Sequence, residues 1–114
     1  MQTIDANNLH IHIAGFTNFG GFYIRQMGPY EKGAVNQGHE HQIDHCMHLV
    51  SGKVSVKWKS PAGEEGIIEV LQPRAKLSIR KDYWHEITAL EDRTEWECWF
   101  AKAEADGIDG DWTA

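Results

Sequence analysis

The chain has 114 residues, of which 41% are hydrophobic and 25% charged, and its formal net charge is −6. This length and composition predict a single soluble globular domain over residues 1–114. The acidic balance argues against nucleic acid or an anionic membrane as a partner. No apolar run approaches the roughly 20 residues that cross a bilayer. The N-terminus lacks a secretory signal, and two cysteines without close spacing favour a reduced, cytoplasmic setting.

Read in order, the chain predicts short strands separated by turns, with no long helical pattern. In most of these segments hydrophobic residues alternate with polar ones, as they do in a strand with one buried face. The expected strands cover residues 9–13, 22–27, 46–50, 53–59, 67–71, 75–80, 85–89 and 94–101. We expect a hairpin across Ser51-Gly52 that joins strands 46–50 and 53–59. We also expect a loop over residues 29–38 and an acidic tail over residues 102–114. The pattern predicts an all-β fold, an antiparallel jelly roll or barrel.

Histidines are concentrated in the segment from Gly33 to Gly52, which holds four of the seven in the chain. His39, His41 and His45 have the same parity, so on an extended chain their side chains leave the same face. Six residues of straight strand span about 20 Å, too far for three ligands of one metal, so the chain must bend between His41 and His45. Neutral imidazoles ligate divalent transition metals, and His85 supplies a fourth.

Strand parity gives a second argument for these histidines. His45 shares a face with Met47, and His85 shares one with Ile87, so both imidazoles are predicted to point into the core. A buried imidazole without a partner is costly, which favours ligation or hydrogen bonding. His48 has the opposite parity to His45, and we expect it on the outer face of the sheet.

The spacing Gly-x5-His-x-His-x3-His-x6-Gly from Gly33 to Gly52 resembles the first motif of the cupin superfamily. A weaker likeness to the second cupin motif runs from Arg80 to His85: the histidine matches, whereas Arg80 and Asp82 replace the usual proline and glycine. The resemblance covers roughly residues 20–101 and implies a double-stranded β-helix, with short N-terminal strands before it. In cupins the position of His45 is usually glutamate, so this chain is similar to the minority with a four-histidine metal site.

The resemblance implies one divalent transition metal per chain, held by His39, His41, His45 and His85. Iron, manganese, copper, nickel and zinc all remain open. It also implies a homodimer, because small cupins pair through their N-terminal strands. Residues 9–13 and the outward-facing Trp99 are the expected contact.

An inward-facing, largely aromatic surface is the expected substrate pocket. Its residues are Met47, Trp58, Trp96, Cys98 and Phe100. Such a surface suits a small molecule with an apolar body and an oxygen-donor end that binds the metal. For Cys98 an ordinary core thiol is the better interpretation, and a thiol lining the cavity near the metal is the alternative. Arg25 and Arg80 are expected on the outer face, although either has the chemistry to hold a carboxylate at the mouth of the barrel.

Three functions fit these features. The first is a small metal-dependent enzyme, either dioxygenase-like or a lyase, cyclase or isomerase, acting on an oxygen-chelating substrate. The second is a non-catalytic sensor that binds a small molecule. The third is a barrel with a purely structural metal.

Overall fold

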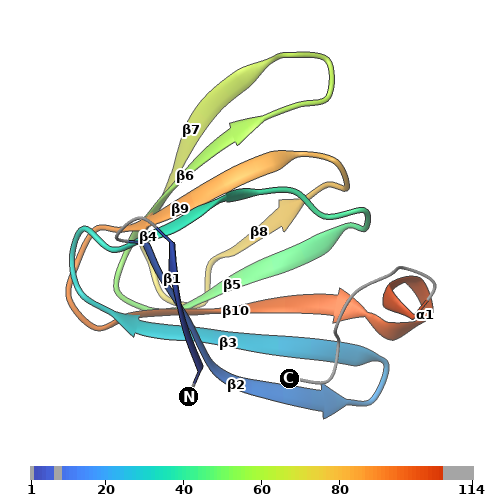
Figure 1. Cartoon of the computed structure of the whole chain (residues 1–114), viewed down its shortest axis with the longest axis horizontal. Helices are drawn as coiled ribbons and strands as arrows, with labels where there is room; N and C mark the ends of the chain where they lie inside the picture. Colours follow the sequence, from blue (N-terminus) through green and yellow to red (C-terminus); the bar gives the residue numbers. More distant parts are fainter. Residues whose placement is uncertain (1, 7–8, 107–114) are drawn as a thin grey trace.

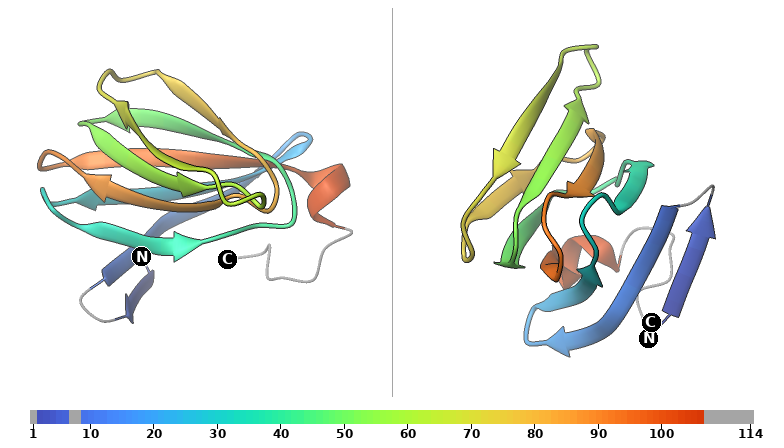
Figure 2. Two further views of the ribbon diagram at one scale, coloured as in Figure 1. Left: turned by 90° about the horizontal axis from the view of Figure 1, so that it is seen from above. Right: turned by 90° about the vertical axis from the view of Figure 1, so that its left-hand side faces the viewer.

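The computed structural model describes residues 2–6 and 9–106, with side chains from Gly20 onward, and it consists of two facing antiparallel sheets (Figures 1 and 2). Its six-stranded sheet has the order β1-β2-β3-β10-β5-β8, and its four-stranded sheet the order β4-β9-β6-β7. The strands are β1 (Gln2–Ala6), β2 (Leu9–Phe19), β3 (Phe22–Tyr30), β4 (Val35–His39), β5 (His45–Ser51), β6 (Val54–Lys59), β7 (Glu65–Val70), β8 (Lys76–Ile79), β9 (Trp84–Ala89) and β10 (Thr94–Ala101). The prediction of an antiparallel all-β fold is confirmed.

The core lies between the two sheets, where alternate residues of the facing strands are buried. β10 shows this best, because every second residue from Thr94 to Phe100 is buried and the residues between are half-buried. The largest buried apolar side chains are Trp96, Phe100, Met47, Leu49, Ile87, Val54 and Val56. Period-two alternation in the sequence therefore reports the inner faces correctly.

The predicted hairpin across Ser51-Gly52 is wrong. β5 pairs with β10 and β8, whereas β6 pairs with β7 and β9 in the other sheet, so the short connection is a corner between the layers. Gly52 turns this corner with φ +77° and lies against the fully buried Thr94. The sequence signal for a hairpin turn also suits such a corner, because both need a residue with positive φ.

The loop expected over residues 29–38 contains a strand. β4 covers Val35–His39 and pairs with β9, which places His39 directly opposite His85. The sequence Val-Asn-Gln-Gly-His hides this strand, because asparagine and glycine are depleted in strands and the apolar alternation is missing. This pairing is what builds one side of the candidate site.

The expected acidic tail opens with a short helix, α1 (Lys102–Ala105), which packs onto the barrel. Ala105 is fully buried, and the backbone N–H of Lys102 donates to the carbonyl of Gly21 at 2.8 Å. The Tyr23 hydroxyl donates to the carboxylate of Asp106. The rest of the expected tail, residues 107–114, lies outside the described residues.

The expected dimer contact in residues 9–13 lies on β2, whose side chains are outside the description, so the homodimer stays a prediction. Within the described residues, no helix is both long and apolar enough to cross a membrane.

Candidate metal centre

The four predicted histidines lie on strands β4, β5 and β9 and on the segment that joins β4 to β5. His39 ends β4, His85 lies opposite it on β9, and His45 begins β5. His41 lies in the bent segment between β4 and β5, where Ile43 is buried and anchors the chain. The expected bend between His41 and His45 is therefore present.

The turn before β9 holds this bent segment in place. The backbone N–H of Asp82 donates to the carbonyl of His41 at 2.7 Å, and that of Lys81 donates to the Asp44 carboxylate at 2.7 Å. Two segments that are about forty residues apart in the chain are thus joined beside the histidines. Fixed backbones of this kind hold ligands in place before a metal binds.

Three of the histidines form a tight group. The ligating nitrogens of His39, His41 and His85 all lie within 4.8 Å of one another, and their ring centroids are 4.5–5.6 Å apart. Metal–imidazole bonds of about 2.1 Å can span such a group after small side-chain adjustments. His45 contacts the group through its ring, with centroids 5.0 Å from His41 and 5.2 Å from His85, but it is not part of the three-nitrogen cluster.

Backbone carbonyls set the tautomers of two histidines. The Nδ1 of His39 donates to the carbonyl of Gln37 at 2.8 Å, and the Nδ1 of His85 donates to the carbonyl of Tyr83 at 3.1 Å. A carbonyl only accepts, so Nδ1 carries the proton in both rings. Their Nε2 lone pairs are left for a metal, as in most histidine-ligated sites.

Burial keeps these imidazoles neutral. It lowers the pKa of His45 to about 2, that of His41 to about 3 and that of His85 to about 4, and it also lowers the pKa of His39. Neighbouring histidines add to the lowering in His45, His41 and His85, and the Arg25 guanidinium adds to it in His39, His41 and His45. At neutral pH all four are in the form that ligates metal.

His45 provides the test of whether these residues fit a metal. It is 5% exposed, its ring stacks on Phe100 at 4.7 Å, and both of its ring nitrogens are buried without a hydrogen-bond partner among the described residues. Leaving such groups unsatisfied costs about 1–3 kcal/mol each. The orphaned nitrogens and the all-imidazole donor set fit a divalent transition metal.

Arg25 lies on the inner face, and its expected place outside the barrel is wrong. It is directly opposite Cys98 in the β3–β10 pair, and its guanidinium lies 5.2 Å from the centroid of the Phe100 ring. Alternation along β3 does not distinguish the two faces, because Ile24, on the face opposite to Arg25, is also buried. The interior beside the histidines therefore carries a positive charge.

The residues of the predicted pocket do not line one common cavity. Trp58 lines a cavity of about 260 Å³ together with His85. Phe100 contacts the rings of His41 and His45, while Met47, Trp96 and Cys98 belong to the buried core. Burial raises the pKa of Cys98 to about 12, so its sulfur is an inert thiol at neutral pH, in line with the core interpretation.

The cavity also has walls outside the predicted substrate pocket. Leu77 and Ile79 of β8, and Tyr83 in the turn before β9, line it beside His85. The β5–β8 pairing puts Ile79 directly opposite His45, which the sequence of β8 alone does not predict. Tyr83 had no periodic signal, because it lies in a turn.

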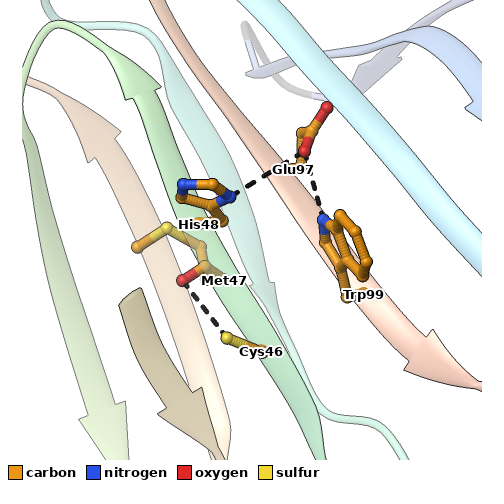
Figure 3. Close-up of polar contacts among 5 residues, drawn as sticks. All are labelled: Cys46, Met47, His48, Glu97 and Trp99. Atoms are coloured by element: carbon orange, nitrogen blue, oxygen red, sulfur yellow. Dashed lines mark hydrogen bonds and ion pairs between the residues drawn. The ribbon is translucent and has the colours of Figure 1, made fainter. Parts of the chain in front are cut away.

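His48 faces outward, as expected. Figure 3 shows it beside Glu97, its direct partner on β10, with Nδ1 4.0 Å from the carboxylate. The indole N–H of Trp99 donates to the same carboxylate at 3.1 Å. His48 is therefore on the opposite side of the sheet from the histidine cluster and serves as a control for it.

Solved structures with similar folds include a cupin superfamily protein from Desulfitobacterium hafniense DCB-2, with TM-score 0.64 and 13% identity over 86% of this chain and 83% of that one. The chain has a cupin fold. KdgF from Halomonas sp. is also similar, with TM-score 0.62 and 19% identity over 95% of this chain and 94% of that one.

A third similar structure is oxalate decarboxylase from Bacillus subtilis, with TM-score 0.65 and 21% identity over 71% of this chain. The matched region spans about a fifth (21%) of the length of that protein. No protein-family profile matches the sequence, and no curated protein matches it. At these identities the similarity establishes the fold alone.

The lowered histidine pKa values predict that the metal-free chain loses stability in mild acid. Below about pH 6.5 these histidines are protonated in the unfolded chain but stay neutral in the folded chain. The free energy of unfolding therefore falls as the pH falls towards the folded pKa values. Each such histidine contributes a slope of up to about 1.4 kcal/mol per pH unit. Urea unfolding in EDTA at several pH values measures this slope. His45→Leu should reduce it, and parallel curves for the two proteins would contradict the prediction.

Proposed function

We propose that the chain is a small metal-dependent cupin enzyme that acts on an oxygen-chelating substrate. His39, His41 and His85 would hold one divalent transition metal, with His45 as the fourth ligand. The observation that carries this proposal is the pair of orphaned ring nitrogens on the buried His45. Iron, manganese, copper, nickel and zinc all suit imidazole donors.

The donor set determines which ligands the site would favour. Four neutral histidines leave a divalent ion at charge +2, whereas three histidines and a carboxylate leave +1. When bound, such an ion supplies Lewis-acid chemistry to a chelated oxygen and, if it is redox-active, the means to react with dioxygen. The inward Arg25 adds to the positive potential, so enolates, carboxylates and similar anions are the expected head groups.

The proposed reaction class follows from this chemistry. A redox-active metal would support a dioxygenase-like reaction, and zinc or nickel a lyase, cyclase or isomerase reaction. Among structures with the same fold, the oxalate decarboxylase is described by its Mn(II) centres, which supports a divalent metal here. The protein's own residues would orient the substrate and exclude water, with Phe100 covering His41 and His45.

A non-catalytic ligand-binding or sensor cupin is the second candidate. Among the described residues, the charged groups that shift the histidine pKa values are other histidines and Arg25, with no carboxylate. A general acid or base of the usual carboxylate kind is therefore not evident beside the site. This observation favours binding without turnover.

Metal content of the untagged protein tests the proposal. We expect about one redox-active metal per chain, a metal-free form that still folds, and dioxygen uptake with a diketone, thiol or phenolic compound. Metal and ligand binding without turnover would favour the sensor. Zinc in every chain with unfolding on chelation would favour a structural metal. No metal under any loading condition would rule out the metal centre.

A further inference from the structure

A half-open cavity of about 260 Å³ adjoins the histidine cluster where the two sheets end. Within the described strands, β7 ends the four-stranded sheet and β8 ends the six-stranded sheet. The cavity is lined by Val56, Trp58, Ile68, Leu77, Ser78, Ile79, Arg80, Tyr83 and His85. Most of these side chains are apolar or aromatic. The volume suits a group of about the size of one aromatic ring rather than a drug-sized ligand.

Cross-strand pairing ties the cavity walls directly to the histidines. Trp58 on β6 is directly opposite His85 on β9, and Ile79 on β8 is directly opposite His45 on β5. Residues paired in this way on one face of a sheet have Cβ atoms about 5 Å apart. The cavity therefore adjoins the candidate metal centre at His85, which belongs to both.

Tyr83 links the cavity to the same histidine in a second way. Its carbonyl accepts the proton of His85 Nδ1, while its ring lies 6.0 Å from the ring of Trp58 at an interplanar angle of 33°. The two rings form one aromatic wall beside His85, a candidate metal ligand. Any molecule bound in the cavity would meet this wall and His85 together.

Two further residues fit a cavity that takes an apolar guest. Gly66, opposite Trp58 on β7, makes room for the indole, because a Cβ there would come within 2.9–3.0 Å of three atoms of the ring. Ile68 pairs with the inward-facing Val56, yet 40% of its surface is exposed. Covering an exposed apolar side chain with an apolar group removes it from water, so binding such a group here is favourable.

We propose that this cavity binds the planar apolar body of the substrate while an oxygen-donor head lies at the histidines. The substrate class is thus an aromatic molecule with a chelating oxygen head, and Trp58 and Tyr83 set the specificity for its body. This inference rests on the proposed function for the position of the head group. It is independent of the reaction that follows.

Two hydroxamates with the same chelating head test the inference. Isothermal titration calorimetry would compare acetohydroxamate with benzohydroxamate on the untagged, Co²⁺-loaded chain, with metal content checked after each titration. We expect wild type to bind benzohydroxamate about 10–100-fold more tightly, because its ring is buried in the cavity. Trp58→Ala should reduce this preference to within about threefold.

Two other variants make the result specific. Gly66→Ala keeps the indole but displaces it into the cavity, so it should also weaken the preference. Trp99→Ala, a tryptophan on the outer face, should leave the preference unchanged. Equal affinities of the two hydroxamates for wild type, or an unchanged preference in Trp58→Ala, would overturn the inference and leave the proposed function standing. A chain that takes up no metal would overturn both.

Discussion

Replacing His45 with leucine is expected to reduce metal affinity on the order of 100-fold without destabilising the metal-free chain. The two effects separate because the His45 ring nitrogens have no partner among the described residues. Leucine has a similar volume and removes two unsatisfied polar atoms, so the free energy of unfolding should stay the same or rise by about 1 kcal/mol. Metal titration with a competing chelator and urea unfolding in EDTA measure the two quantities.

Two variants on β5 control this experiment, one at position 45 itself and one on the opposite face of the strand. His45→Glu restores the commoner cupin donor at the same place and should retain metal. His48→Leu removes an imidazole from the outer face and should leave metal affinity unchanged. Loss of stability in metal-free His45→Leu, with metal affinity kept, would show that His45 is a packing residue and not a ligand.

Gly52→Ala is expected to destabilise the fold by about 3–5 kcal/mol, a large part of the stability of a domain of this size. At φ +77° an alanine is strained by about 1–3 kcal/mol. Its Cβ would also lie 2.2 Å from the hydroxyl of the fully buried Thr94 and 2.8 Å from its Cα. The hydroxyl donates to the carbonyl of Glu91 at 2.7 Å, so Thr94 cannot move away cheaply. Urea unfolding of the metal-free protein measures the change.

Gly63→Ala is the matched control for this variant. Gly63 has a similar positive φ of 93°, but a Cβ there would meet nothing within 4 Å. Gly63→Ala should lower the free energy of unfolding only by the cost of backbone strain, about 1–2 kcal/mol. Equal losses at Gly52 and Gly63 would show that backbone strain alone, and not the contact with Thr94, makes the first glycine necessary.

Gly52 also shows how a family motif acquires a physical meaning. The sequence has a glycine seven residues after His45, and its position predicts a hairpin turn. In the structure the same residue turns the chain from the β5 sheet to the β6 sheet, close against Thr94 of β10. Local sequence predicts the need for positive φ, but the choice between a hairpin and a corner depends on which strands pair.

Side-chain parity made much of the candidate site predictable. Parity alone placed His45 and His85 inside and His48 outside, because successive side chains of a strand leave opposite faces. Parity failed at Arg25, since Ile24 on the other face of β3 is buried as well and the strand has no clear polar side. It also said nothing of Tyr83, which lies in a turn.

By itself, the sequence determined the all-β class, the inner faces of most strands and the four histidines that share the interior. Only the tertiary structure decided that β4 brings His39 opposite His85, that Trp58 lies on the other side of His85, and that Ile79 is opposite His45. The physical reason is that alternation is a local property, set by the pleat of one strand. Neighbouring strands are chosen by burial and hydrogen bonding between segments distant in the chain, which no single segment encodes.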